Sequence, residues 1–323
     1  MSVARLLGTL VLLATLAGFG ALASAEQVNG YFIYVVNLTL INAIAAIGLV
    51  IVSGAAGQMS LGTSALLAIG AYATGMLTTH FGVPWLAAAI VGAFAATVIG
   101  TLLAAPALRL TGLHLAIVTL AFGVIVVQLI GKGGKWTGGM SGLTLAEADL
   151  LGFAMNTEAR RYWVIAGTFF AVALSASAFL RRKPGRALLA LREREPTARA
   201  LGIDVARYKT LAFAYSSFLA GLAGALYAPL KGYISVDDFN IWQSIYFFVM
   251  IAVGGMTSIA GGVLGAIVVT VLPEALRGLQ DAANAVFGIL LMLIIIFLPG
   301  GLVSLGQPLR RLLPGRAGAG ETP

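Results

Sequence analysis

Long apolar runs constrain the fold of this sequence more than any other feature. The segments 31–52, 85–105 and 285–305 contain no Asp, Glu, Lys or Arg, and each has about the 20 residues that a helix needs to cross a membrane. Of the 323 residues 59% are hydrophobic and only 10% are charged, against roughly 25% charged in soluble domains. Because the backbone in lipid must satisfy its own hydrogen bonds, such runs fold as helices. The sequence therefore predicts an all-α polytopic membrane protein.

The apolar runs predict about ten transmembrane helices within one transmembrane domain, 1–323. They cover residues 6–22, 31–52, 63–79, 85–105, 112–130, 162–180, 210–230, 244–257, 263–276 and 285–305. We expect residues 1–25 to contain an uncleaved first span, although a signal peptide ending in small residues has the same pattern. With both termini inside, the inner side carries fourteen basic and four acidic residues and the outer side six and eight. This asymmetry predicts cytoplasmic termini, including the tail 306–323.

The only extended polar segment is 179–211, which holds nine of the twenty basic residues. Short Lys- and Arg-rich loops stay in the cytoplasm, so the part 181–209 is predicted to face it. Pro196 is suited to the first position of a helix over 198–201, Gly202 to its end and Asp204 to the N-cap of the next helix. A small ordered helix there would serve to dock a soluble partner. The alternative is a solvated loop that only sets the topology.

Two glycine-rich interruptions, 54–62 and 254–262, lie in the two halves of the chain. Broken helices in corresponding positions indicate a substrate path, because unwound backbone in a membrane must face protein or a water-filled cavity. The alternative is that these glycines serve helix packing or tight turns. The candidate path residues are Gly57, Gln58, Ser60, Gly62, Tyr72, Gly254 and Gly255.

The composition also limits the chemistry. The spans hold no central ionisable residue, Glu274 being the deepest, which argues against an ion-coupled carrier. The sequence has no G-x-x-x-x-G-K-[ST] phosphate loop and no cysteine, and His80 and His114 stand at unrelated positions. We therefore expect no cofactor, no metal site and no enzymatic activity. The +8 net charge follows from the loops and does not indicate nucleic-acid binding. A transporter that has neither coupling charges within its spans nor a nucleotide site of its own must take its energy from another subunit, or be a passive channel.

Several motifs resemble those of one transporter family. The sequence G-Q-M-S-L-G at 57–62, followed by G-A-Y at 70–72, resembles the signature of permease subunits of branched-chain amino-acid ABC importers, in particular the M-type permease. Further matching segments lie at 109–112, 117–122, 137–143, 185–187, 200–203, 220–224, 254–255 and 298–299.

This resemblance implies a subunit of the bacterial inner membrane that moves branched-chain amino acids by alternating access. Its implied partners are a homologous H-type permease, two cytoplasmic ATPases, a periplasmic substrate-binding protein and membrane lipid. The segment from Arg192 to Gly202 resembles the coupling helix that inserts into an ATPase groove. The implied coupling residues are Arg194, Glu195, Pro196, Thr197, Ala198, Leu201 and Gly202.

The sequence departs from the family pattern at three places. T-S-A-L at 63–66 stands where H-A-A-F is frequent, T-S-I-A-G at 257–261 replaces G-x-x-W-G, and Gly300 follows Pro299 where Arg is common. These changes make groups near the expected path smaller and leave the substrate open. Urea or a short amide is the alternative within the family, and a lone channel or ion-coupled carrier is the alternative outside it.

Overall fold

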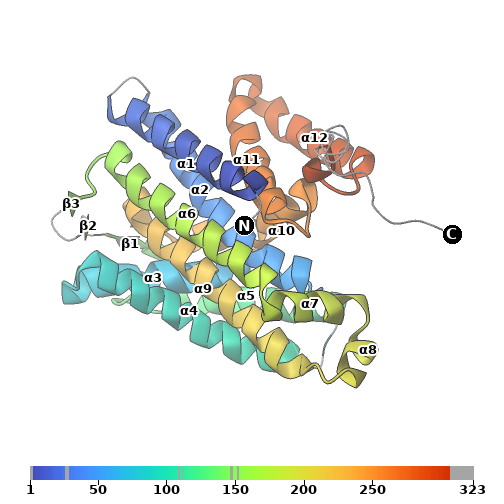
Figure 1. Ribbon diagram of the computed structural model, residues 1–323. Coiled ribbons are helices and arrows are strands. Elements are labelled where there is room, and N and C mark those ends of the chain that lie inside the picture. The colour runs from blue at the N-terminus through green and yellow to red at the C-terminus, as the bar shows by residue number, and fades with distance from the viewer. Residues whose placement is uncertain are drawn as a thin grey trace.

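The computed structural model describes residues 3–25, 29–107, 110, 112–145, 148–150 and 153–305. The predicted all-α class is confirmed: the chain is a bundle of helices with four two-residue strands at one end (Figure 1). The α-helices are α1 (Val3–Ser24), α2 (Gly30–Leu49), α3 (Thr63–Phe81), α4 (Trp85–Ala107), α5 (Leu113–Gly131), α6 (Glu158–Arg181), α7 (Lys183–Glu193), α8 (Glu195–Ala200), α9 (Val205–Lys231), α10 (Ile241–Gly254), α11 (Ile259–Ala275) and α12 (Ala283–Phe297).

Helix α2 is the buried axis of the bundle. It continues without a break into a π-helix, Val50–Ala55, and 89% of an 18-residue apolar stretch within the combined helix is buried. Helices α6, α9, α10 and α11 pack around it. Small residues allow this, as on Gly48, where a methyl group would lie 3.0 Å from the backbone oxygen of Ser216 on α9. Close backbone approach at small residues is how helices associate in lipid.

Among the described residues, five helices are long and apolar enough to cross a membrane, namely α2 with its π-helix, α4, α5, α6 and α9. The pair α10 and α11 meets the same criteria only jointly and bends by 120° at 255–258. The shorter apolar helical segments include Leu13–Ser24 in α1 and Ala285–Phe297 in α12. The described residues thus establish a multi-pass protein, and the count of ten crossings stays a prediction.

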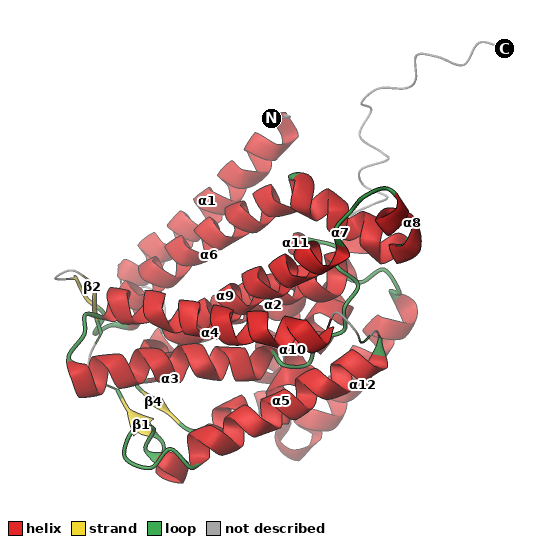
Figure 2. Cartoon of the chain, turned by 90° about the horizontal axis from the view of Figure 1, so that it is seen from below, coloured by secondary structure: helices red, strands yellow, loops and turns green. Residues whose placement is uncertain are grey.

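The strands lie at the end of the bundle opposite α7 and α8 (Figures 1 and 2), where one pair ties the α5–α6 connection to the α9–α10 connection. β1 (Leu143–Thr144) pairs antiparallel with β4 (Tyr233–Ile234), and β2 (Asp149–Leu150) with β3 (Phe153–Ala154). Short 3-10 helices flank them at Gly139–Ser141 and Val236–Phe239, and others lie at Arg277–Ala282 and Leu302–Leu305. Sequence periodicity missed these strands because two residues are too short to show it.

The basic segment contains two helices where one was predicted. Helix α8 begins at Glu195 with Pro196 in its first turn, and it ends at Ala200, so the predicted bounds 198–201 were wrong. Gly202 adopts a φ of 81°, and the Asp204 carboxylate accepts from the backbone N–H of Arg207 at 3.1 Å. Both predicted signals are confirmed. The second helix, α7, was not predicted.

Candidate functional site

The first broken segment turns the chain inside the bundle. After the π-helix, Ala56 N–H donates to the oxygen of Ile51 at 3.0 Å, and Gly57 reverses the backbone with a φ of 67°. Residues 57–62 then run without regular structure to the start of α3. A π-helical turn that continues an α-helix is often found at functional sites. Irregular backbone in a membrane protein is tolerated where protein or a water-filled cavity surrounds it.

Gln58 is the unusual side chain of this segment. It is 4% exposed, and neither its amide nitrogen nor its amide oxygen has a hydrogen-bond partner among the described residues. Its backbone is well held, because its N–H donates to Val52 and its oxygen accepts from the Ser53 hydroxyl, both at 3.0 Å. An unpaired buried amide costs about 1–3 kcal/mol. The backbone of Gln58 is therefore fixed, and its buried amide has hydrogen-bonding capacity that no described residue uses.

Hydroxyl groups from two other helices hold the start of α3. The N–H of Leu61 donates to the Thr119 hydroxyl of α5 at 2.9 Å, and the N–H of Ser64 donates to the Ser244 hydroxyl of α10 at 3.3 Å. The Ser64 hydroxyl is buried and has no hydrogen-bond partner among the described residues. Thr119 and Ser64 lie in segments compared with the family, but none of the three residues was predicted to line the path. Polar residues isolated in apolar runs were the available signal, and that signal is weak because serine and threonine often bond their own helix.

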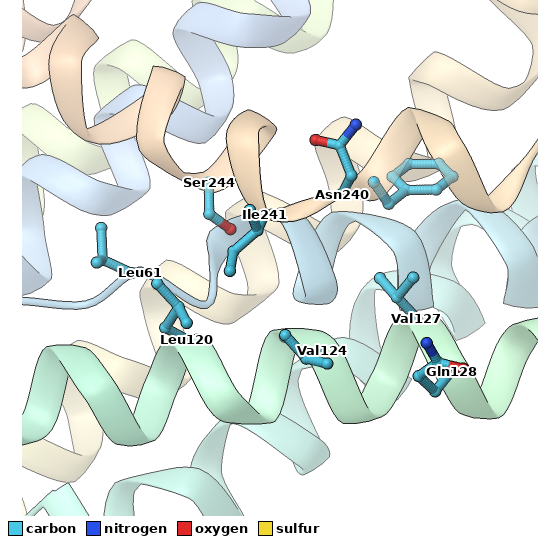
Figure 3. Close-up of a pocket in the computed structure, with 10 residues that line it drawn as sticks. Leu61, Leu120, Val124, Val127, Gln128, Asn240, Ile241 and Ser244 are labelled. Atoms are coloured by element: carbon cyan, nitrogen blue, oxygen red, sulfur yellow. The ribbon is translucent and has the colours of Figure 1, made fainter.

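A cavity of about 110 Å³ lies between α5, α10 and the end of the broken segment (Figure 3). Its lining is mostly apolar, and none of the described residues that line it is charged. The Asn240 amide is already used, since its oxygen caps α10 by accepting from Gln243 N–H at 3.2 Å. Such a space suits a small aliphatic group next to a hydroxyl. The lining residues are Leu61, Leu120, Gly123, Val124, Val127, Gln128, Phe239, Asn240, Ile241 and Ser244.

The predicted path residues divide into two groups. Gly57, Gln58, Ser60 and Gly62 lie in the same segment as the cavity-lining Leu61, which Ser60 and Gly62 flank, and Ser60 is buried. Tyr72 lies further along α3, yet its ring meets Phe239 of the cavity edge-on, with 5.8 Å between the ring centroids.

The other two path residues, Gly254 and Gly255, pack elements together. A methyl group on Gly254 would overlap the backbone oxygen of Gly261, which brings α10 and α11 together at their bend. Gly255 has a φ of 121° and follows the end of α10. This geometry agrees with the alternative interpretation, in which these glycines serve helix packing and a tight turn. The two broken segments nonetheless touch, because a methyl group on Gly54 would overlap the backbone oxygen of Met256 in the bend.

The predicted coupling residues lie in and next to α8, at the end of the molecule that carries the basic segment 179–211, here called the basic end. Residues 194–202 form the tip of this end. Leu201 is 78% exposed, and Arg194, Pro196, Thr197 and Gly202 are also exposed. Ala198 faces inward, in a small apolar cluster with Leu191 of α7 and Val205 of α9. The Lys209 ammonium, with 5% of its side chain exposed, pairs with the Glu195 carboxylate at 2.8 Å. The tip is thus an ordered and exposed structure.

A multi-pass helical bundle with a buried, interrupted segment beside an uncharged cavity has the features of a membrane permease. Comparison of the sequence with family models shows which one. The chain belongs to the family described as "Branched-chain amino acid transport system / permease component", whose model matches residues 31–299.

Curated relatives agree with this assignment. The chain is 33% identical over 308 residues to the high-affinity branched-chain amino acid transport system permease protein LivM of Escherichia coli, an alignment that covers 88% of this chain and 72% of the relative. LivM of Salmonella typhimurium is 32% identical with the same coverage. A probable branched-chain amino acid transport permease protein LivM of Methanocaldococcus jannaschii is 28% identical over 224 residues, 64% of each chain. No solved structure matches the chain.

Proposed function

We propose that this protein is the transmembrane permease subunit of an ATP-binding-cassette importer that moves branched-chain or related amino acids across a bacterial inner membrane. The observation that carries the proposal is the family match over residues 31–299, together with relatives named for this transport. The uncharged cavity beside Ser244 supports an aliphatic cargo. The protein itself does not hydrolyse ATP in this proposal, which agrees with a sequence that has no phosphate-binding loop motif.

The proposed assembly has four kinds of component besides this chain: a homologous H-type permease, two cytoplasmic ATPases, a periplasmic binding protein and the surrounding lipid. The chain crosses the membrane about ten times as one domain, with both termini and α7–α8 in the cytoplasm. The charge asymmetry of its loops supports this orientation. The exposed tip around Leu201 is the surface offered to an ATPase.

The cargo path is proposed to pass the broken segment at Gln58 and Ser60 and the cavity at Ser244. Its polar groups are an amide and hydroxyls, which can pair with either the ammonium or the carboxylate of an amino acid. Movement between outward- and inward-facing states then exposes this path alternately. Gly254 and Gly255 contribute to it as the packed bend of α10 and α11 rather than as lining.

Labelled leucine uptake into proteoliposomes tests the function. The liposomes hold this chain with its co-purified partners, and uptake is measured with and without ATP on the ATPase side. We expect ATP-dependent leucine accumulation that excess urea does not reduce. Leucine entry that ignores ATP would contradict the importer and favour a lone channel or carrier. ATP-driven entry of urea without entry of leucine would retain the family and change the cargo.

A further inference from the structure

The guanidinium of Arg192 joins the basic end of the protein to the first broken segment. Its Nη1 donates to the backbone oxygen of Gly54 at 2.6 Å, across 138 positions of sequence. The stem of the same side chain lies over Gly57, where a methyl group would be 3.0 Å from Cγ and 3.5 Å from Cβ of Arg192. Hydrogen bonds from a charged donor are among the strongest that proteins make. Arg192 therefore holds both the end of the π-helix and the turn that follows it.

The position of the acceptor explains why an arginine suits this site. Gly54 lies at the end of the π-helix Val50–Ala55, where the last carbonyl groups lack partners within the helix. A cation at this end also interacts favourably with the helix dipole. On its other side Gly54 packs directly against the backbone of Met256 in the α10–α11 bend. The same residue is thus held between α7 and the second broken segment.

The part of the molecule that carries Arg192 is packed as one unit onto the start of α9. Leu191, next to Arg192, packs with Ala198 of α8 and Val205 of α9 in one buried cluster. The pair between Lys209 and Glu195 fastens α8 to α9 a second time. Apolar packing and a largely buried ion pair therefore connect the exposed Leu201 to the helix that carries Arg192.

We propose that Arg192 is a positioning residue that transmits movement of the α7–α8 unit to the broken segment 54–62, through its hydrogen bond to Gly54. This inference rests on the proposed function, since the movement is the one that a cytoplasmic ATPase imposes on the tip. In the importer, Arg192 moves the end of the π-helix, and Gly54 passes the movement to the α10–α11 bend. The cavity beside Leu61 lies at the other end of the same segment.

The test separates coupling from folding. The complete importer is prepared with Arg192→Met, and ATP hydrolysis and leucine uptake are measured in the same proteoliposomes. We expect assembly and ATP hydrolysis to persist, while leucine accumulated per ATP falls about tenfold, the equivalent of losing roughly 1.4 kcal/mol of hydrogen bonding. Arg192→Lys, which keeps one charged donor within reach of Gly54, should retain more coupling than Arg192→Met.

The matched control is Lys183→Met, which removes a positive charge from the same helix. Lys183 is exposed, and its ammonium has no hydrogen bond or ion pair among the described residues. This variant should transport like the wild type. Wild-type leucine accumulation per ATP in Arg192→Met, or an equal loss in Lys183→Met, would overturn the inference. Absence of ATP-driven accumulation in the wild-type importer would instead overturn the proposed function, and the inference with it.

Discussion

At the scale of single residues, the contact between the two broken segments depends on a missing side chain. A methyl group on Gly54 would overlap the backbone oxygen of Met256, which cannot rotate away as a side chain can. We expect Gly54→Ala to lower the free energy of unfolding by about 1–3 kcal/mol, as overpacking does, and thermal melting in detergent measures this. Gly167→Ala on α6 is the control, since a methyl group there meets nothing within 4 Å and should not lower stability.

At Gln58 we expect a substitution to lower the uptake rate without lowering the stability. Its buried amide has no partner among the described residues, so Gln58→Leu removes an unpaired polar group and should leave thermal stability unchanged or raised. If the amide pairs with cargo during passage, the uptake rate should fall by roughly 5- to 150-fold, the equivalent of about 1–3 kcal/mol. Docking of the binding protein should not change. An unchanged uptake rate would return Gln58 to a packing role.

At the scale of elements, the docking of α8 depends on an asymmetric ion pair. The Lys209 side chain is 5% exposed, whereas that of Glu195 is 31% exposed and also contacts Arg199 at 3.2 Å. Glu195→Gln leaves a buried ammonium without its counter-charge, but Lys209→Met removes the buried charge itself. We therefore expect Glu195→Gln to destabilise α8 more, by roughly 1–3 kcal/mol, which is less than a fully buried pair would lose.

Hydrogen exchange over residues 195–203 measures this difference directly. Exchange should be faster in Glu195→Gln than in Lys209→Met, and faster in both than in the wild type. If the Lys209 variant exchanges faster, the desolvation of the ammonium does not govern the docking of α8.

The same segment shows which elements local sequence could predict. The Asp204 cap and the left-handed Gly202 are local signals, and both were predicted correctly. Helix α7, which has Pro184 and Gly185 in its first turn, was not predicted. Proline is tolerated in a first helical turn, and Gly185 is needed where α7 meets α6, since a methyl group there would overlap the backbone oxygen of Leu180. Only the packed structure shows that second reason.

At the scale of the whole molecule, the proposed orientation puts α7 and α8 in the cytoplasm and the strand-bearing end outside. The absence of native cysteine makes this testable in intact spheroplasts. A membrane-impermeant maleimide should label Trp136→Cys, which lies in an exposed external connection, and should not label Lys183→Cys until the membrane is opened. Labelling of Lys183→Cys from outside would reverse the proposed topology.

The sequence by itself determined the helical class, the membrane environment, the caps of α8 and α9 and the family. Each of these depends on local features: apolar runs of membrane length, hydrogen bonds within a few residues, and motifs read in order. It also predicted the broken segment 54–62 and named Gln58 as a candidate path residue. It did not distinguish glycines of a path from glycines of a packed bend, because glycine serves both roles.

Only the tertiary structure decided which distant groups meet. Gly54 and Met256 touch across about 200 positions, and Arg192 reaches Gly54 across 138. The start of α3 is held by Thr119 and Ser244, which lie on α5 and α10. Backbone hydrogen bonding forms each helix within its own segment, but these contacts arise when separate helices pack at small residues. For this reason the link from the basic end to the broken segment is visible in the fold and absent from any single motif.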